Sequence, residues 1–360
     1  MTAFVQEMVS GPVDIIGDVH GEIDALRRLL GRLGCFPERG VAQRPVIFVG
    51  DLVDRGPDSP AVVDLVMEMV RDGIAQVVLG NHEFNLLRRD HKEGNGWAFG
   101  RSDDHYPLHR GADRFKVHFG SKVPTEEQLE RFLHFFATLP LALHREDLRV
   151  AHASWNGSAI SMLPASGDII AISDQRQQET EAALALDGTL ELEEAELARW
   201  HQLRRKDIEP NEWLGAHAHA EETRQLSDPV RIITSGPERK IDGDRPFYVG
   251  GKWRYVQRDN WWHRYNEEPA VVVGHYWRSR HGSSIEGKQD AWSTKSPTEW
   301  VGVRQNVFCV DFSVGRRFLE RWEGRQERFH HGLAALRWPE RELVFDDGWV
   351  IDSDGKGHPG

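Results

Sequence analysis

Short hydrophobic runs alternate with amphipathic stretches over the first ninety residues of the chain. Runs rich in valine, isoleucine and leucine at 13–16, 46–49 and 75–79 predict three strands. Between them, 22–33 and 59–71 repeat leucine, valine or methionine every three or four positions, which is typical of helices with one buried face. Strands and helices that alternate in this way build β-α-β units around a parallel sheet. The pattern therefore predicts an α/β fold.

Glycine and polar residues follow each of these strands directly. The three blocks are Gly17-Asp18-Val19-His20-Gly21, Gly50-Asp51-Leu52-Val53-Asp54-Arg55-Gly56 and Gly80-Asn81-His82-Glu83. Because the carboxyl ends of parallel strands meet at one edge of a sheet, we expect the three blocks to lie together. Carboxylate, amide and imidazole groups without thiolates suit Mn, Fe or Zn. One Gly-Asp pair alone would indicate an ordinary turn, but three blocks in succession predict a metal site.

The later part of the chain is less regular. A stretch at 177–198 carries seven acidic and no basic side chains, which favours a solvated helical insertion. The segment 94–120 is rich in glycine, histidine and aspartate, and we expect an inserted loop there. Strand patterns return at 148–151, 270–273, 307–312, 333–336 and 343–345.

These patterns predict one interrupted domain. Residues 12–160 and 268–347 are expected to form the core, with a partly helical, cap-like insertion at 161–267 between them. The segment 348–360 contains glycine, aspartate and proline, and we expect it to be a frayed tail.

Composition narrows the class of protein. The 360 residues are 39% hydrophobic and 28% charged, which excludes a disordered, collagen-like or fibrous chain. The net charge of −12 argues against electrostatic binding of nucleic acid or an anionic membrane by the chain as a whole. Nucleic acid is therefore expected only as a substrate. No apolar run approaches the roughly 20 residues of a membrane span. Cys35 and Cys309 lie far apart and form no metal-binding or redox pair, so we expect a cytoplasmic protein.

The three blocks together resemble the signature of the calcineurin-like metallophosphoesterases, specifically the phosphoprotein-phosphatase-type branch. This branch includes symmetrical diadenosine tetraphosphatases, Ser/Thr phosphatases and the phosphatase module of bacterial polynucleotide kinase-phosphatases. Later segments are also similar to the family: 150–154 to its strand-end histidine block, 273–275 to its Gly-His block, and 308–311 to a closing strand. The resemblance implies a four-layer αββα sandwich with metals at the carboxyl ends of the central strands.

The resemblance also implies two divalent metal ions. One would be held by Asp18, His20 and Asp51, and the other by Asp51, Asn81, His152 and His275. A carboxylate shared by two cations about 3.5–4 Å apart, with a bridging water of lowered pKa, produces a hydroxide near neutral pH for in-line attack on phosphorus. Mn²⁺ is the expected metal, with Fe or Zn as alternatives. For His152 and His275, the alternative is a structural role in hydrogen bonding.

Three further residues receive roles from the same resemblance. His82 would be the general acid that protonates the leaving oxygen, and Asp54 would orient its imidazole. Arg55 would bind the phosphate through two parallel hydrogen bonds, which a lysine makes poorly. The alternative to these roles is that the same three residues form a surface ion-pair cluster.

A basic aromatic stretch lies at 239–264, with seven Lys or Arg against three Asp. Arginines can pair with phosphates and aromatic rings can stack on nucleobases, so substrate contacts are one interpretation. The alternative is that these aromatic side chains form a core for the insertion. The candidate substrate contacts are Trp261, Trp262, Tyr276 and Arg278.

The function expected from the sequence is a metal-dependent phosphoesterase. Its substrate would be a phosphorylated small molecule or a nucleotide such as diadenosine tetraphosphate. A phosphoprotein (Ser/Thr) phosphatase with the same centre is the first alternative, followed by a nucleic-acid end phosphatase. No G-x-x-x-x-G-K-[ST] kinase motif is present. A non-catalytic binding module on the same fold is the alternative from another class, and it predicts missing ligands, whereas all six ligand positions are filled.

Overall fold

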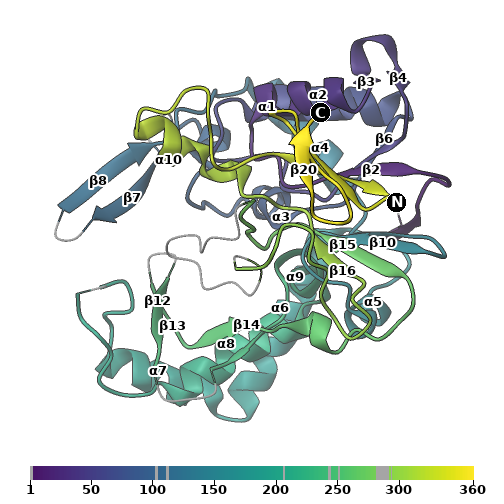
Figure 1. Ribbon diagram of the computed structural model, residues 1–360. Coiled ribbons are helices and arrows are strands. Elements are labelled where there is room, and N and C mark those ends of the chain that lie inside the picture. Colours follow the sequence, from purple (N-terminus) through teal and green to yellow (C-terminus); the bar gives the residue numbers. More distant parts are fainter. Residues whose placement is uncertain are drawn as a thin grey trace.

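The computed structural model describes residues 3–360 apart from 102, 103, 111, 112, 206, 242–244, 250, 251, 281–291 and 293. Two mixed β-sheets lie at its centre (Figure 1). The larger sheet has the strand order β20-β19-β18-β17-β2-β5-β6. In that order its strands are Gly357–Pro359, Trp349–Ile351, Glu342–Phe345, Ala334–Trp338, Val13–Ile16, Val46–Phe48 and Ala75–Val77.

The smaller sheet has the order β1-β9-β10-β15-β16. Its strands are Val5–Glu7, Ala142–His144, Leu148–Ala151, Ala270–Val273 and Val307–Cys309. In the larger sheet β2, β5 and β6 run parallel, and in the smaller sheet β10, β15 and β16 do so. Each sheet therefore brings the carboxyl ends of several strands to one edge.

The two sheets pack face to face through one hydrophobic cluster. Ile15 and Ile47 of the larger sheet and Val150, Val272 and Phe308 of the smaller sheet all belong to it and are buried. Strands buried on both faces need apolar residues at successive positions, which explains the continuous runs of valine and isoleucine.

Helices cover the outer faces of both sheets. The helices α1 (Ile23–Arg32) and α2 (Ser59–Arg71) share a hydrophobic cluster with Ile16 and Phe48 of the larger sheet. On the other side, Ile233 of α9 (Pro229–Ser235) shares that cluster with residues of the smaller sheet. The layers run helix, sheet, sheet, helix, so the predicted four-layer α/β sandwich is confirmed.

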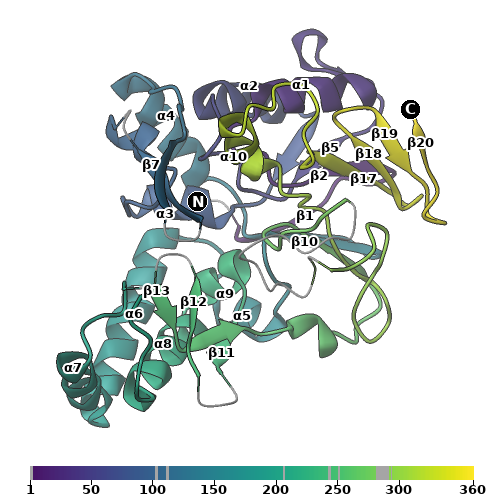
Figure 2. The same ribbon diagram turned by 60° about the vertical axis from the view of Figure 1, so that its left-hand side comes forward.

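The segment between β10 and β15 is mainly helical. In both views α6 (Ile169–Leu186), α7 (Thr189–Arg199) and α8 (Gly215–Ser227) lie at the end of the molecule opposite α1 and α2 (Figures 1 and 2). A separate cluster that includes Trp200, Leu214 and Tyr255 packs α7 and α8 against the short strands that follow. The helices are α5 (Gly157–Met162), α6 (Ile169–Leu186), α7 (Thr189–Arg199), α8 (Gly215–Ser227) and α9. The strands are β11 (Glu238–Lys240), β12 (Phe247–Val249), β13 (Lys252–Arg254) and β14 (Val256–Arg258).

The division into a core and an insertion at 161–267 stays a prediction. The cluster under α7 and α8 is separate, but Ile169 and Ile233 from the same segment belong to the main core. The remaining elements are β3 (Cys35–Phe36), η1 (Pro37–Arg39), β4 (Val41–Ala42), α3 (Asn81–Leu87), η2 (Gly96–Phe99), α4 (Glu126–Ala137), η3 (Trp261–His263), η4 (Val314–Arg316) and α10 (Arg317–Trp322).

Three segments differ from the sequence-based expectations. The expected loop at 94–120 contains a hairpin, in which β7 (His105–Arg110) pairs with β8 (Asp113–His118). The expected frayed tail at 348–360 instead adds β19 and β20 to the larger sheet, because Val350 and Ile351 are buried against it. The core also begins before residue 12, since β1 pairs with β9.

Among the described residues, none of the helices combines the length and the apolar character that crossing a bilayer requires.

A buried carboxyl group on β2 gives a prediction about stability. Burial raises the pKa of Asp14 to about 6, although Arg337 on the neighbouring strand opposes this shift. A carboxyl whose pKa is raised by folding contributes stability while it is protonated, and that contribution is lost as the pH rises through about 6. Asp14→Asn is therefore expected to raise the free energy of unfolding at pH 8 by about 1–3 kcal/mol.

Urea unfolding of the wild type and Asp14→Asn at pH 4 and pH 8 tests this expectation. The gain should shrink markedly at pH 4, where the native carboxyl is already neutral. A gain of the same size at both pH values would show that the Asp14 charge is not its cause.

Candidate active site

Polar side chains from both sheets meet at the carboxyl ends of their strands. They follow β2, β5 and β6 in the larger sheet and β10 and β15 in the smaller one. In chain order these residues are Asp18, His20, Asp51, Asn81, His152 and His275. The backbone N–H of His275 donates to the Asp18 carboxylate at 3.1 Å, which joins the ends of β2 and β15 across 257 positions of sequence. The structure thus brings all six sequence-predicted ligands to one place.

Two groups of ligand-type side chains share Asp51. In each group the ligand atoms lie within 4.8 Å of one another. The groups are His20, Asp51 and His82, and Asp51, His152 and His275. Asp18 adjoins the first group, with its Oδ2 3.9 Å from the Nε2 of His20. A carboxylate common to both groups is the arrangement expected of a bridging ligand.

Asn81 stands between the two histidines of the second group. Its Oδ1 lies 3.0 Å from the Nε2 of His152 and 2.8 Å from the Nδ1 of His275. The Nε2 of His152 is also 3.3 Å from the Oδ1 of Asp51. Oxygen and nitrogen atoms thus converge from four segments of the chain, as they do around a divalent cation.

Backbone carbonyls fix the tautomers of two of the imidazoles. The Nδ1 of His152 donates to the carbonyl oxygen of Val49 at 2.7 Å, and the Nδ1 of His20 donates to that of Val53 at 3.0 Å. This places a proton on each Nδ1 and directs each Nε2 toward the carboxylates, which is the outer arrangement typical of metal-bound histidine. The residues present therefore fit a metal centre.

Glycines leave room for the carboxylates. A Cβ atom at Gly274 would lie 2.1 Å from the Oδ1 of Asp18, and one at Gly80 would lie 2.3 Å from the Oδ1 of Asp51. Any larger residue at either position would displace a ligand. The Gly-Asn-His and Gly-His blocks thus need glycine at these positions, because any Cβ atom would collide with a carboxylate of the site.

Strained backbone is concentrated at the same place. Within the described ranges, nine non-glycine residues have positive φ, and five of them belong to the candidate active site. These five are His20, Asp51, Asp54, Arg55 and His275. Each such conformation costs on the order of 1–3 kcal/mol and persists only where the surrounding structure holds it. This clustering marks the strand ends as a functional site.

The site is also strongly acidic in its interior. Burial, and next the nearby Asp311, raise the pKa of Asp18 well above its usual range. Burial likewise raises the pKa of Asp311 to about 6, and its Oδ2 has no hydrogen-bond partner among the residues that the structure describes. Although burial opposes it, His152 and His82 hold the pKa of Asp51 well below its usual range. Divalent cations would supply the positive charge that this group of buried carboxylates lacks.

His82 is held by a chain of hydrogen bonds. Its Nδ1 lies 2.5 Å from the Oδ2 of Asp54, whose Oδ1 accepts from the indole Nε1 of Trp97 at 2.7 Å. With Nδ1 engaged in this way, the Nε2 of His82 faces the site, where it lies 3.7 Å from the Oδ2 of Asp51. This geometry agrees with the orienting role expected for Asp54.

Arg55 lies over the mouth of the site. Its Nη1 is 2.9 Å from the Nε2 of His20, and its Nη2 is 3.1 Å from the Nε2 of His82. The guanidinium group thus spans the two imidazoles with both of its terminal nitrogens. These are the atoms that would bind two oxygens of a phosphate.

Three residues of the site were not singled out from the sequence. Glu83 is buried and accepts the backbone N–H groups of Asp51 and Leu52 at 2.9 and 2.8 Å, so it holds the turn that carries Asp51. Its position directly after Asn81-His82 was the only sequence signal for it. Asp311 lies in the predicted strand at 307–312, in the segment similar to a closing strand of the family, but no role in the site was assigned to it from the sequence. Trp97 carried no signal, because its contact with Asp54 joins separate parts of the chain.

The four candidate substrate contacts are buried, although the ring centroid of Tyr276 lies 5.2 Å from that of His275. Trp261, Trp262 and Tyr276 are at most 4% exposed and belong to one aromatic cluster on the outer face of the smaller sheet. Arg278 is fully buried, and its Nη1 donates to the carbonyl oxygen of Cys309 at 3.1 Å. Side chains so enclosed cannot stack on a substrate or bind its phosphate. The predicted contacts are therefore wrong, and the aromatic residues form a core.

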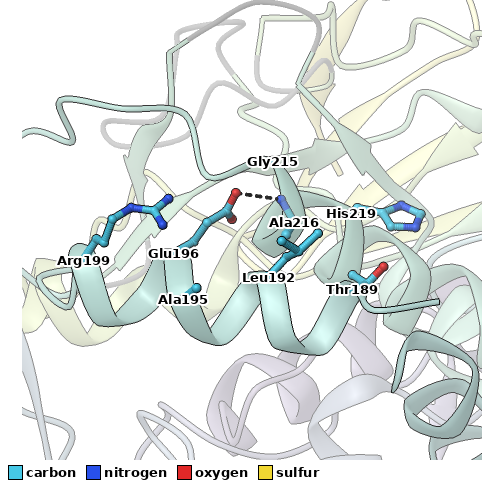
Figure 3. A pocket seen from close by; sticks show the side chains of 8 residues that line it. All are labelled: Thr189, Leu192, Ala195, Glu196, Arg199, Gly215, Ala216 and His219. Carbon is cyan, nitrogen blue, oxygen red and sulfur yellow. Dashed lines mark hydrogen bonds between the residues drawn. The ribbon is translucent and has the colours of Figure 1, made fainter. Parts of the chain in front are cut away.

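A separate hollow of about 340 Å³ lies between α7 and α8 (Figure 3). Glu196 spans its floor and accepts the backbone N–H of Ala216 at 3.1 Å, and Arg199 and His219 stand at its two ends. It is lined by none of the residues of the candidate active site.

Curated proteins that are similar in sequence to part of this chain include two bis(5'-nucleosyl)-tetraphosphatases. An asymmetrical bis(5'-nucleosyl)-tetraphosphatase of Oceanobacillus iheyensis is 34% identical over 147 residues, which are 39% of this chain and 55% of that protein. A symmetrical bis(5'-nucleosyl)-tetraphosphatase of Ralstonia nicotianae is 41% identical over 80 residues, or 22% of this chain and 26% of that protein. The chain thus spans about half the length, or less, of these curated relatives.

A solved structure of a cold-active protein-tyrosine phosphatase from a Shewanella species aligns with 99% of this chain and 82% of its own, with 14% identity and a TM-score of 0.44. The family described as calcineurin-like phosphoesterase matches residues 11–232, which is well over half of the sequence and includes five of the six candidate ligands. The chain belongs to this family of calcineurin-like phosphoesterases.

Proposed function

We propose that the protein is a phosphoesterase that uses two divalent metal ions to hydrolyse a phosphate ester or anhydride. The observation that carries this proposal is the presence of Asp51 in both ligand groups, with the His82–Asp54 pair directly beside them. A phosphoesterase needs a place for cations and a group that protonates the leaving oxygen, and these features supply both.

The metal ions would be held by the residues expected from the sequence. Asp18, His20 and Asp51 would bind one ion, and Asp51, Asn81, His152 and His275 the other. Oxygen and imidazole ligands without a thiolate favour Mn²⁺, with Fe or Zn as the alternatives. When bound, such ions lower the pKa of water and neutralise charge that develops on the phosphate.

The protein's own residues would bind the phosphate and move one proton. Arg55 would turn its two terminal nitrogens from the imidazoles to two phosphate oxygens. The Nε2 of His82 would donate a proton to the leaving oxygen as the P–O bond breaks. Asp54 would keep the Nδ1 proton in place and stabilise the charged imidazole, while Trp97 fixes the Asp54 carboxylate.

The substrate we favour is a nucleotide with a phosphoanhydride chain, such as diadenosine tetraphosphate. The relatives in the comparison are named as bis(5'-nucleosyl)-tetraphosphatases, which supports a nucleotide over a phosphoprotein or a nucleic-acid end. The proposal includes a cytoplasmic location, where the free thiols of Cys35 and Cys309 would remain reduced.

A metal-reconstitution assay tests the activity. Protein stripped with a chelator is expected to be inactive on p-nitrophenyl phosphate and to regain turnover with Mn²⁺, more than with Mg²⁺ or Ca²⁺. Rates on diadenosine tetraphosphate, a phosphopeptide and a 3′-phosphorylated oligonucleotide then rank the substrate classes, with the nucleotide expected first. Absence of metal-dependent turnover on all four substrates would refute the proposal and favour a non-catalytic module.

A further inference from the structure

Trp277 joins two arginines at the mouth of the candidate active site. The Cζ of Arg55 lies 5.2 Å from the centroid of the indole ring, and the Cζ of Arg316 lies 5.5 Å from the same centroid. Trp277 follows the candidate ligand His275 by two positions, and the side chains of all three contacting residues are only partly buried. The ring therefore links the proposed phosphate-binding arginine to a second guanidinium that solvent can reach.

The turn that carries Arg316 is fixed against the site. Ser313 has a φ of 64°, and its backbone N–H donates to the Oδ1 of Asp311 at 2.7 Å. Two residues later, a Cβ atom at Gly315 would lie 2.5 Å from the Cδ2 of His20. The backbone before Arg316 thus touches the ring of a candidate metal ligand. Because the turn is anchored on both sides, the position of Arg316 relative to the site is set by the fold.

Charge is arranged in two zones around this mouth. The carboxylates of Asp18, Asp51 and Asp311 are buried in the interior, at most 2% exposed, where cations would bind. Arg55 and Arg316 are less buried than these carboxylates, and both contact Trp277. In the described part of the chain, the hydrogen bonds of the Arg55 guanidinium go to imidazoles and none goes to a carboxylate. An anionic ligand that enters the site would therefore meet two guanidinium groups first.

We propose that Arg316, positioned by its contact with Trp277, binds a second phosphate group of the substrate, next to the phosphate held by Arg55. The inference rests on the proposed function and specifies its substrate class as one with at least two linked phosphates. A guanidinium group suits this task because it binds phosphate oxygens in pairs, and the indole ring holds its plane without neutralising its charge. A monoester has no group that reaches Arg316, so this residue would distinguish anhydrides from simple monoesters.

The test compares two substrates in one variant. Arg316→Ala is expected to lower kcat/KM for diadenosine tetraphosphate and for inorganic tripolyphosphate about 10- to 100-fold more than kcat/KM for p-nitrophenyl phosphate. Arg316→Lys should recover part of this difference. Arg304→Ala is the matched control. Arg304 is exposed and donates to the carbonyl oxygen of Asn266. It precedes β16, whereas the site lies at the other end of that strand.

A binding measurement gives a readout that needs no turnover. Calorimetry with a non-hydrolysable methylene analogue of tripolyphosphate and Mn²⁺-loaded protein should show a Kd about tenfold or more weaker in Arg316→Ala, with orthophosphate much less affected. Equal losses for both ligands, or none, would overturn the inference. A loss for diadenosine tetraphosphate without one for tripolyphosphate would also overturn it, because it would assign Arg316 to the nucleoside. Wild type that binds the analogue through Arg316 but hydrolyses nothing would refute the proposed activity alone.

Discussion

Alanine in place of His82 is expected to lower kcat by about 10²–10⁴-fold on diadenosine tetraphosphate. The Nε2 of His82 faces the site and its Nδ1 is fixed by Asp54, so this residue is placed to protonate the leaving oxygen. The loss should be smallest for p-nitrophenyl phosphate, because p-nitrophenolate is stable without a proton. Steady-state rates on both substrates measure this difference.

Metal content decides between two roles for His82. The imidazole belongs to one of the two ligand groups, so it could instead bind a metal ion directly. If His82 is a general acid and binds no metal ion, the His82→Ala variant should retain both ions, as measured by metal analysis after gel filtration. Loss of one ion in this variant, with equal rate losses on both substrates, would contradict the general-acid role. His134→Ala, at an exposed position on α4, is the matched control.

Substitution of Asp51 by asparagine is expected to abolish binding of both metal ions, and activity with it. Asp51 is common to both ligand groups, and an amide neither carries the negative charge nor bridges two cations well. At a free Mn²⁺ concentration of 100 Kd, one ion that binds only the folded state adds about 2.7 kcal/mol to the free energy of unfolding, and two such ions add about 5.4 kcal/mol. Wild type should show this gain, and Asp51→Asn should show none.

Thermal unfolding with and without Mn²⁺ measures this difference. Asp64→Asn serves as the matched control, because Asp64 pairs with Arg131 at the surface of α2 and α4 and touches none of the ligands. Two ions retained in Asp51→Asn, or an unchanged gain with Mn²⁺, would show that the two groups do not share this carboxylate.

Much of the site could be predicted because its signals are local. Asp18, Asp51 and Asn81 each follow a buried strand directly, and parallel strands bring their carboxyl ends together whatever the rest of the chain does. His152 and His275 follow equally clear apolar runs. For these residues the local pattern and the final position agree, which is typical of a site built on strand ends.

The remaining features depend on contacts that a local pattern does not encode. The hairpin of β7 and β8 contains Pro107 and many polar residues. In β8 only Val117 is buried, so the usual alternation of buried and exposed positions is weak. Trp261 and Trp262 could stack on a base or fill a core equally well by composition, and only the packing against β15 and β16 separates the two. The contact of Trp97 with Asp54 likewise appears only in three dimensions.

The joining of the two sheets at the site has a consequence for how the protein is made. His275 follows Asn81 by 194 positions, and its Nδ1 lies 2.8 Å from the Oδ1 of Asn81 in the site. At typical synthesis rates of about 5–20 residues per second, the first blocks leave the ribosome about 10–40 s before His275 does. The early strands and helices can fold in this interval, but the second group of ligands is incomplete. A nascent chain therefore carries Asp18 and Asp51 well before it carries the complete set of candidate ligands.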